Sequence, residues 1–274
     1  MKKYSFPYHD SLSFLLGLIG LFLVFAASCP ARVLAGQAGT SSGKLQREYP
    51  PDKLQEVIRQ IERKYLGESA EGLMTMQVAT RHYTRKMRMQ YWSKGKDLFL
   101  VTILYPAKDE GISTLKVGKD IWNYLPKVDR VIKIPPSMMG GSWMGSHITN
   151  DDLVKESQIA DDYTFRLIED RDGIWVIEAL PKPEAAVVWG KMMYEIIMPD
   201  LVPRRISYFD EEGKEVRGMK YSDIQEIQGR KIPLSIEVTP LDKPNESTTL
   251  RYEKIHFGIS LKDDFFSLRN LKKR

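Results

Sequence analysis

From Gly72 onward, the hydrophobic pattern of the chain has a period of two, and this pattern constrains the fold more than any other feature. Side chains at alternate positions of a strand lie on one face of a sheet. The residues that share a face on the first two predicted strands are Met74, Met76, Val78, Met87, Met89 and Tyr91. Further apolar stretches follow at regular spacing, separated by short Gly, Asp and Asn turns. This arrangement predicts an antiparallel meander of about ten or eleven strands.

One amphipathic helix precedes the strands, at residues 51–66. Pro51 suits its first turn and Gly67 its end. Its apolar residues recur at intervals of three and four, and they are Leu54, Val57, Ile58, Ile61 and Leu66. Large sheets tend to curl or close. We therefore expect a mainly β protein, in which a curved antiparallel sheet forms an incomplete, half-open barrel and helices cover its concave face.

The N-terminus has the order of a secretory signal peptide. "MKK" supplies positive charge, Leu12 to Ser28 are apolar, and "VLA" at 33–35 offers small residues for cleavage before Gly36. We expect a signal peptide at 1–35, a flexible mature N-terminus at 36–50, and one folded domain at 51–274. The predicted location is the periplasm.

Two alternatives for the N-terminus stay open. The apolar run is close to the lower length limit for a retained membrane anchor. Lipidation of Cys29 is the other alternative, although Ala26 and Pro30 do not favour it. Cleavage after Ala35 would remove the chain's single Cys, and with it any thiolate nucleophile or thiolate metal ligand.

Motifs for catalysis, metal binding or nucleic-acid binding are weak. The four His residues have no metal-ligand spacing, and the paired acids lie in predicted turns. "GGSWMG" lacks the strand-to-helix context of a nucleophile elbow. Although the net charge is +5, basic residues alternate with acids. We expect no catalytic residues, no metal, no cofactor and no nucleic-acid partner.

The densest basic cluster is "TRHYTRKMR", residues 80–88. We interpret it as a docking patch for an acidic partner or anionic lipid head groups. A solvated hairpin tip is the alternative interpretation. The predicted docking residues are Arg81, Arg85, Lys86 and Arg88.

The segment "IPPSMMGGSWMGSHITNDDL", residues 134–153, is apolar without any period and is broken by Pro and Gly. Thr149 or Asn150 can cap a short helix at its end. We expect the segment to act as a lid over an apolar groove. The predicted lid residues are Met138, Met139, Gly140, Gly141, Trp143 and Met144.

Methionines recur on the same strand faces, where they favour a surface that adapts to varied apolar ligands. An ordinary close-packed core is the alternative. The predicted groove residues are Met74, Met76, Met87, Met89, Tyr91, Trp122 and Tyr124.

Three stretches resemble a known family. They are "VGKDIWNYLPKVDRVIKIPPSMMGGSWMGSHITNDDLVK" at 117–155, "PRRISYFDEEGKEV" at 203–216 and "YSDIQEIQGRKIPLSIEV" at 221–238. Together they are similar to outer-membrane lipoprotein-sorting proteins, the group of the periplasmic carrier LolA. The resemblance implies that 51–274 is a lipid-binding or lipoprotein-binding domain built as an incomplete barrel plugged by helices. It also implies no enzyme activity, and transport of lipid or lipoprotein acyl chains. An inner-membrane exporter and an outer-membrane acceptor would be its partners. A non-enzymatic interaction module of a cell-envelope or exporter complex is the alternative function.

Overall fold

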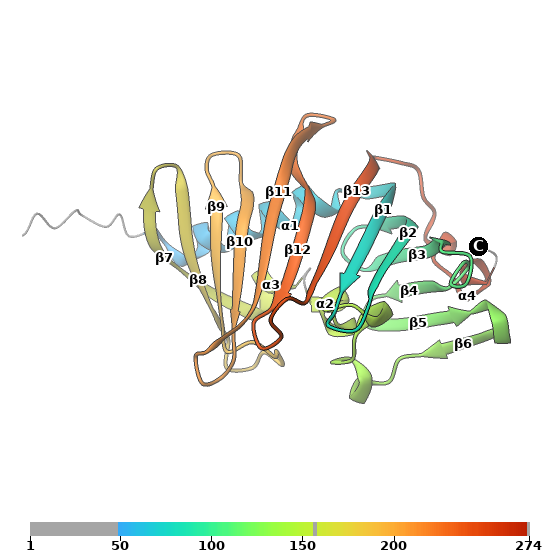
Figure 1. Cartoon of the computed structure of the whole chain (residues 1–274). Helices are drawn as coiled ribbons and strands as arrows, with labels where there is room; N and C mark the ends of the chain where they lie inside the picture. The colour runs from blue at the N-terminus through green and yellow to red at the C-terminus, as the bar shows by residue number, and fades with distance from the viewer. Residues whose placement is uncertain (1–48, 156–157, 273–274) are drawn as a thin grey trace, which may run out of the picture. The chain divides into compact units, whose positions relative to one another are not determined.

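A single antiparallel sheet dominates the structure (Figure 1). The computed structural model describes residues 49–155 and 158–272, and within these residues the sheet has thirteen strands. All of them belong to the unit Arg47–Arg274. The predicted signal peptide, Cys29 and most of the predicted flexible N-terminus lie outside the described residues.

The strands follow one another along the chain in two groups. The first group is β1 (Ser69–Ala79), β2 (Thr84–Lys94), β3 (Leu98–Tyr105), β4 (Ser113–Val117), β5 (Asp120–Leu125) and β6 (Arg130–Lys133). The second group is β7 (Tyr163–Arg171), β8 (Ile174–Pro181), β9 (Lys191–Ile197), β10 (Val202–Phe209), β11 (Glu215–Ile227), β12 (Arg230–Pro240) and β13 (Ser247–Phe257). There are more strands than the predicted ten or eleven, because stretches as short as β6 pair as separate strands.

The two groups are meanders joined by pairing between β1 and β13. Strands β6 and β7 are the two edges of the sheet, so the sheet does not close. Register shifts, such as those at Leu73/Met74 and Arg88/Met89, interrupt the ladders. Such irregularities bend strands and increase their twist. The predicted curved, incomplete barrel is confirmed.

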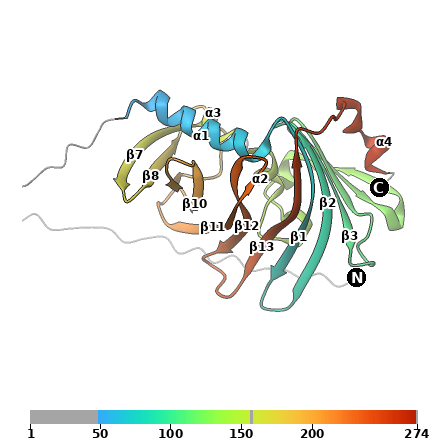
Figure 2. The same cartoon turned by 90° about the horizontal axis from the view of Figure 1, so that it is seen from above.

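Helix α1 (Pro51–Leu66) forms where the sequence predicts it. Pro51 occupies its first turn, and the N–H of Gly67, at φ 61°, donates to the Arg63 carbonyl at its end. Leu54, Ile58 and Ile61 are buried. Figures 1 and 2 show the helix running along the sheet from β7 toward β13.

The chain must cross from one edge of the sheet to the other between β6 and β7. Residues 134–162 make this connection, which we call the crossover. It contains the short helices α2 (Asn150–Lys155) and α3 (Ile159–Asp162). Three-residue 3₁₀ turns lie at Pro136–Met138 and Trp143–Gly145.

Reciprocal hydrogen bonds fix the start of α2. The Thr149 N–H donates to Asp152 Oδ2 at 2.7 Å, and the Asp152 N–H donates to Thr149 Oγ1 at 3.1 Å. This is a capping-box arrangement with Asp in the acidic position, so Thr149 is the cap. Asp152 also accepts two hydrogen bonds from the buried Arg217 of β11, at 2.7 and 2.9 Å. The buried ion pair therefore fastens α2 to the sheet.

A second, smaller hydrophobic cluster contains Trp92, Leu100 and Leu115. The C-terminal segment packs on it through Phe266 and through Leu271 of α4 (Leu268–Leu271), which follows the 3₁₀ turn Asp263–Phe265. A last 3₁₀ turn, Pro126–Val128, links β5 to β6. The C-terminus is thus held on the β2–β5 part of the sheet.

Candidate ligand cavity

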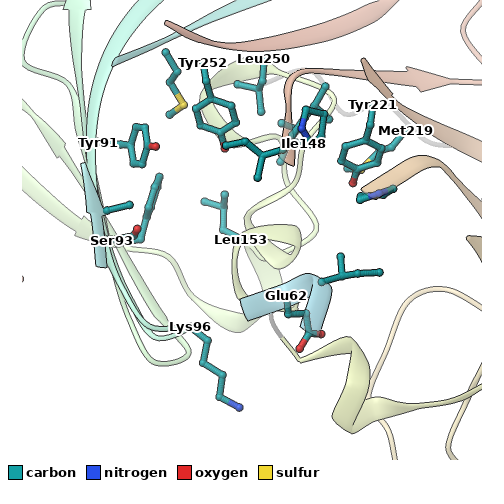
Figure 3. A pocket seen from close by; sticks show the side chains of 18 of the residues that line it. Glu62, Tyr91, Ser93, Lys96, Ile148, Leu153, Met219, Tyr221, Leu250 and Tyr252 are labelled. Atoms are coloured by element: carbon teal, nitrogen blue, oxygen red, sulfur yellow. The ribbon is translucent and has the colours of Figure 1, made fainter. Parts of the chain in front are cut away.

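A cavity of about 260 Å³ lies between the sheet, α1 and the crossover (Figure 3). Its wall is mainly apolar. The sheet contributes Ala70, Met74, Tyr91, Phe99, Met219, Tyr221, Leu250 and Tyr252, among others. Helix α1 contributes Ile58, Ile61 and Glu62, and the crossover contributes Trp143, Ile148, Leu153 and Ile159. Elements far apart in the sequence therefore enclose one apolar space.

Tyrosines from several strands line this space, and they are Tyr91, Tyr194, Tyr208, Tyr221 and Tyr252. The rings of Tyr91 and Tyr252 meet edge to face, with centroids 5.7 Å apart. Burial, and to a smaller degree the neighbouring Tyr252, raises the pKa of Tyr91, so its hydroxyl stays neutral. The Tyr208 hydroxyl donates to the Met219 sulfur at 3.2 Å. The wall thus combines large apolar rings with a few neutral polar atoms.

Gly72 makes room for the Tyr91 ring. The two residues pair across β1 and β2. A Cβ at Gly72 would lie 2.8 Å from Cε1 of Tyr91 and 2.1 Å from the carbonyl oxygen of Lys254. Since no side chain fits there, Gly72 leaves the space that the Tyr91 ring occupies at the cavity wall.

Polar groups gather at one side of the cavity. Figure 3 shows Lys96 and Glu62 on the same side, away from Leu250 and Tyr252. Lys116 is 5% exposed, and its Nζ donates to the Lys96 carbonyl at 2.7 Å. Glu62 Oε1 accepts from the Ala160 N–H at 3.1 Å. Burial raises the pKa of Glu62. The cavity therefore has an apolar body and one charged end.

The predicted lid divides into two parts. Trp143 is buried in the cavity wall, where its Nε1 donates to Thr114 Oγ1 at 3.1 Å. Met144 is partly buried and packs against the main core. Like Met144, the remaining lid residues lie outside the cavity lining, and these are Met138, Met139, Gly140 and Gly141. The inner part is a wall of the cavity, and movement at the glycines stays a prediction.

Two hairpin ends hold the inner part of the crossover. Arg85 Nη1 donates to the Met144 carbonyl at 3.2 Å, and Arg85 pairs with Asp109 at 2.9 Å. His147 contacts Thr248 Oγ1 through its backbone N–H at 3.0 Å and through Nδ1 at 2.9 Å. Its Nε2 lies 3.1 Å from Glu246 Oε2. The wall next to Ile148 is thereby tied to the β12–β13 turn.

The predicted basic docking residues do not form one surface. Arg85 points to the crossover, because it alternates with Lys86 and Arg88 along β2. Lys86 and Arg88 lie on the opposite, exposed face of β2, where Arg88 pairs with Glu253 at 2.8 Å. Arg81 is exposed at the hairpin tip, 3.8 Å from Glu246. Docking through Arg81, Lys86 and Arg88 stays a prediction, whereas Arg85 has a structural contact.

The predicted groove residues also divide. Met74 and Tyr91 line the cavity. Met76, Met87 and Met89 are fully buried in the main core and are not part of the cavity lining.

Trp122 and Tyr124 pack in the second cluster. On β5, Asn123 instead faces Thr114, which hydrogen-bonds Trp143, so its two neighbours project to the other side. The structure does not bring Trp122 and Tyr124 to the cavity.

Sequence reasoning missed much of the wall. Met219 and Tyr221 on β11, and Leu250 and Tyr252 on β13, alternate as Met74 and Met76 do. That alternation was a usable signal. The charged end of the cavity could not be predicted from the sequence, because Glu62, Lys96 and Lys116 lie far apart along the chain.

The described ranges 49–155 and 158–272 contain no helix with the length and apolarity to cross a membrane. In the same ranges, no three His, Cys, Asp or Glu side chains are grouped to hold a metal ion.

A model of a protein family described as uncharacterized-protein-like matches residues 95–273, more than half of the chain. The chain belongs to this family. Among curated proteins, none matches it.

Solved structures show the same fold. A DUF1329 family protein from Desulfovibrio piger has a TM-score of 0.72 and 20% identity, over 81% of this chain and 99% of that one. A protein from Vibrio parahaemolyticus, described as an outer membrane lipoprotein-sorting protein domain, has a TM-score of 0.71 and 20% identity, over 81% and 100%. A LolA superfamily protein from Nitrosomonas europaea has a TM-score of 0.66 and 21% identity, over 79% and 98%. The chain thus has the same open-barrel fold as these three proteins.

Proposed function

We propose that this chain is a non-enzymatic periplasmic carrier that holds the acyl chain of a lipid or lipoprotein in the cavity on the concave face of its sheet. The apolar cavity between α1, the crossover and the sheet is the observation that carries the proposal. The names of the solved relatives support a lipid-related role for the fold.

The free energy gained by removing methylene groups from water favours binding of an acyl chain in this cavity. Each CH₂ removed from water contributes about 0.8 kcal/mol. The volume of about 260 Å³ is at the small end for a ligand site, where typical pockets hold roughly 300–1,000 Å³. A long chain therefore needs the crossover or α1 to move outward. Gly145, at φ 70°, and the exposed Gly140 and Gly141 are where we propose that this movement occurs.

The location and partners complete the proposal. Export would remove residues 1–35, which N-terminal sequencing of the exported protein would establish. An inner-membrane exporter would load the carrier and an outer-membrane acceptor would receive its cargo.

Displacement of a fluorescent fatty acid tests the function. Leu250 of β13 is half-buried at the cavity wall, so Leu250→Glu would place a carboxylate where the chain lies. We expect this variant to stay folded by circular dichroism and to lose binding. Leu180→Glu is the matched control, because Leu180 is a strand leucine that is 44% exposed. Specific peptide binding by wild type without any lipid binding would favour the interaction module instead.

A further inference from the structure

Two neighbouring side chains of β2 bring hydroxyl groups to the cavity wall. Tyr91 and Ser93 are two positions apart on the strand, so both point into the cavity, as Figure 3 shows. Trp92, between them, packs on the other side of the sheet in the second cluster. Among residues 49–155 and 158–272, no group forms a hydrogen bond with either hydroxyl. Neither oxygen is fully enclosed by the protein, so both can reach a ligand in the cavity.

The neighbouring strands place no polar side chain beside these hydroxyls. The residues that pair with Tyr91 and Ser93 are apolar, and they are Gly72 and Ala70 on β1 and Val101 and Phe99 on β3. Both Tyr91 and Ser93 are themselves buried. Two polar groups therefore lie in an otherwise apolar part of the wall.

Other tyrosines of the same wall differ in this respect. The hydroxyls of Tyr208 and Tyr221 both donate to the Met219 sulfur, at 3.2 and 3.7 Å. A buried hydroxyl without a hydrogen bond lowers stability relative to one with a partner. A phenylalanine in place of Tyr91 and an alanine in place of Ser93 would line the cavity without that cost. A wall for hydrocarbon alone would therefore not need these two hydroxyls.

We propose that the cargo carries a neutral carbonyl group, in the ester or amide bond of its acyl chain, which accepts hydrogen bonds from the hydroxyls of Tyr91 and Ser93. A carbonyl oxygen has two lone pairs, so one group can use both donors. The hydrocarbon chain lies against Tyr252 and Leu250, which line the same cavity. This inference rests on the proposed carrier function and adds the chemical class of the polar group beside the chain.

Ester and ether ligands of equal chain length test the inference. Methyl oleate is compared with oleyl methyl ether, and 1-oleoylglycerol is compared with 1-O-oleylglycerol, each by displacement of a neutral fluorescent acyl probe. The members of each pair differ only in a carbonyl group in place of a methylene group. A hydrogen bond between neutral groups changes affinity by about threefold to tenfold. We expect wild type to bind the ester of each pair more tightly by that factor, although the carbonyl must first lose its water.

Two variants connect this preference to the hydroxyls. Tyr91→Phe and Ser93→Ala should each reduce the ester preference about threefold, and the double variant should abolish it, while the affinity for the ether stays unchanged. Since neither hydroxyl has a hydrogen-bond partner among the described residues, neither variant should lower the Tm of the lipid-free protein. If Tyr91→Phe does not fold, Ser93→Ala decides.

Tyr163→Phe is the matched control. Tyr163 is buried and is not part of this cavity's lining, and its hydroxyl donates to the Trp189 carbonyl at 3.4 Å. Removing that hydroxyl should lower the Tm and leave the ester preference unchanged. The control therefore separates loss of a structural hydrogen bond from loss of a bond to the ligand.

Infrared spectra of bound methyl oleate with a ¹³C-labelled carbonyl give a readout that does not depend on affinity. A hydrogen-bonded carbonyl absorbs at lower frequency than a free one. We expect the low-frequency band in wild type and in Tyr163→Phe, and a shift to higher frequency in the double variant.

Equal affinities for ester and ether in wild type would overturn the inference and leave the carrier function standing. An unchanged ester preference in the folded double variant would also overturn it, because the carbonyl would then be bound by water or by another group. If neither member of either pair binds, the carrier function itself fails, and the inference fails with it.

Discussion

Two buried alanines offer a sharp test of the cavity. Ala70 of β1 is 2% exposed and lines the cavity, whereas Ala179 of β8 is fully buried in the core and is not part of the cavity lining. Leu adds three carbon atoms to either site. In Ala70→Leu these atoms fill empty space, which stabilises the lipid-free protein by up to about 2 kcal/mol. In Ala179→Leu they overpack the core, which costs about 1–3 kcal/mol.

The assay is thermal unfolding of lipid-free protein followed by acyl-chain titration. One kcal/mol shifts the Tm by about 2–4 °C in a domain of this size. We expect the Tm of Ala70→Leu to rise by about 4–8 °C and that of Ala179→Leu to fall. The added leucine occupies the place of ligand methylenes, so Ala70→Leu should weaken acyl binding by up to about 30-fold. If both variants lose stability equally, the space beside Ala70 is closed and the cavity argument is refuted.

Three further predictions follow from the same structure. Asp152→Asn leaves Arg217 buried without its anion, so the free energy of unfolding should fall by about 3–5 kcal/mol, seen as a Tm lower by about 6–20 °C. A Tm shift below about 2 °C would show that this ion pair does not stabilise the fold. The raised folded pKa of Glu62 means that its contribution to stability is present at acidic pH and is lost as pH rises through that pKa. The stability of Glu62→Gln relative to wild type should therefore increase from about pH 4 to pH 7 in urea titrations, and a flat difference would contradict this. Charge reversal at Lys86 and Arg88 should weaken binding to anionic vesicles with a stability change below about 0.5 kcal/mol, and unchanged binding at low salt would leave these residues as a solvated surface.

The fold follows from the sequence to a large extent. The period of two along Met74 and Met76 identifies strands, and Pro51 and Gly67 mark the ends of the helix. Both signals are local, since each depends on residues a few positions apart. The open edges are harder to predict, because they depend on which strands pair across the whole chain.

The site is less predictable, because its wall combines elements distant in sequence. Residues 134–153 were expected to be a lid, and the lack of any period did indicate an unusual role. That this segment crosses between the two edges of the sheet follows only from the strand order. Trp122 shows the same limit, since one position along a strand decides which face a side chain occupies.

The most direct test of the carrier function is photo-crosslinking with a diazirine-bearing fatty acid, followed by peptide mapping. We predict one label per protein, placed on peptides that contain Tyr91, Ile148 or Tyr252, and a loss of labelling when excess oleic acid competes. Labelling confined to exposed surfaces, or labelling that oleic acid does not reduce, would contradict the proposal that an acyl chain occupies this cavity.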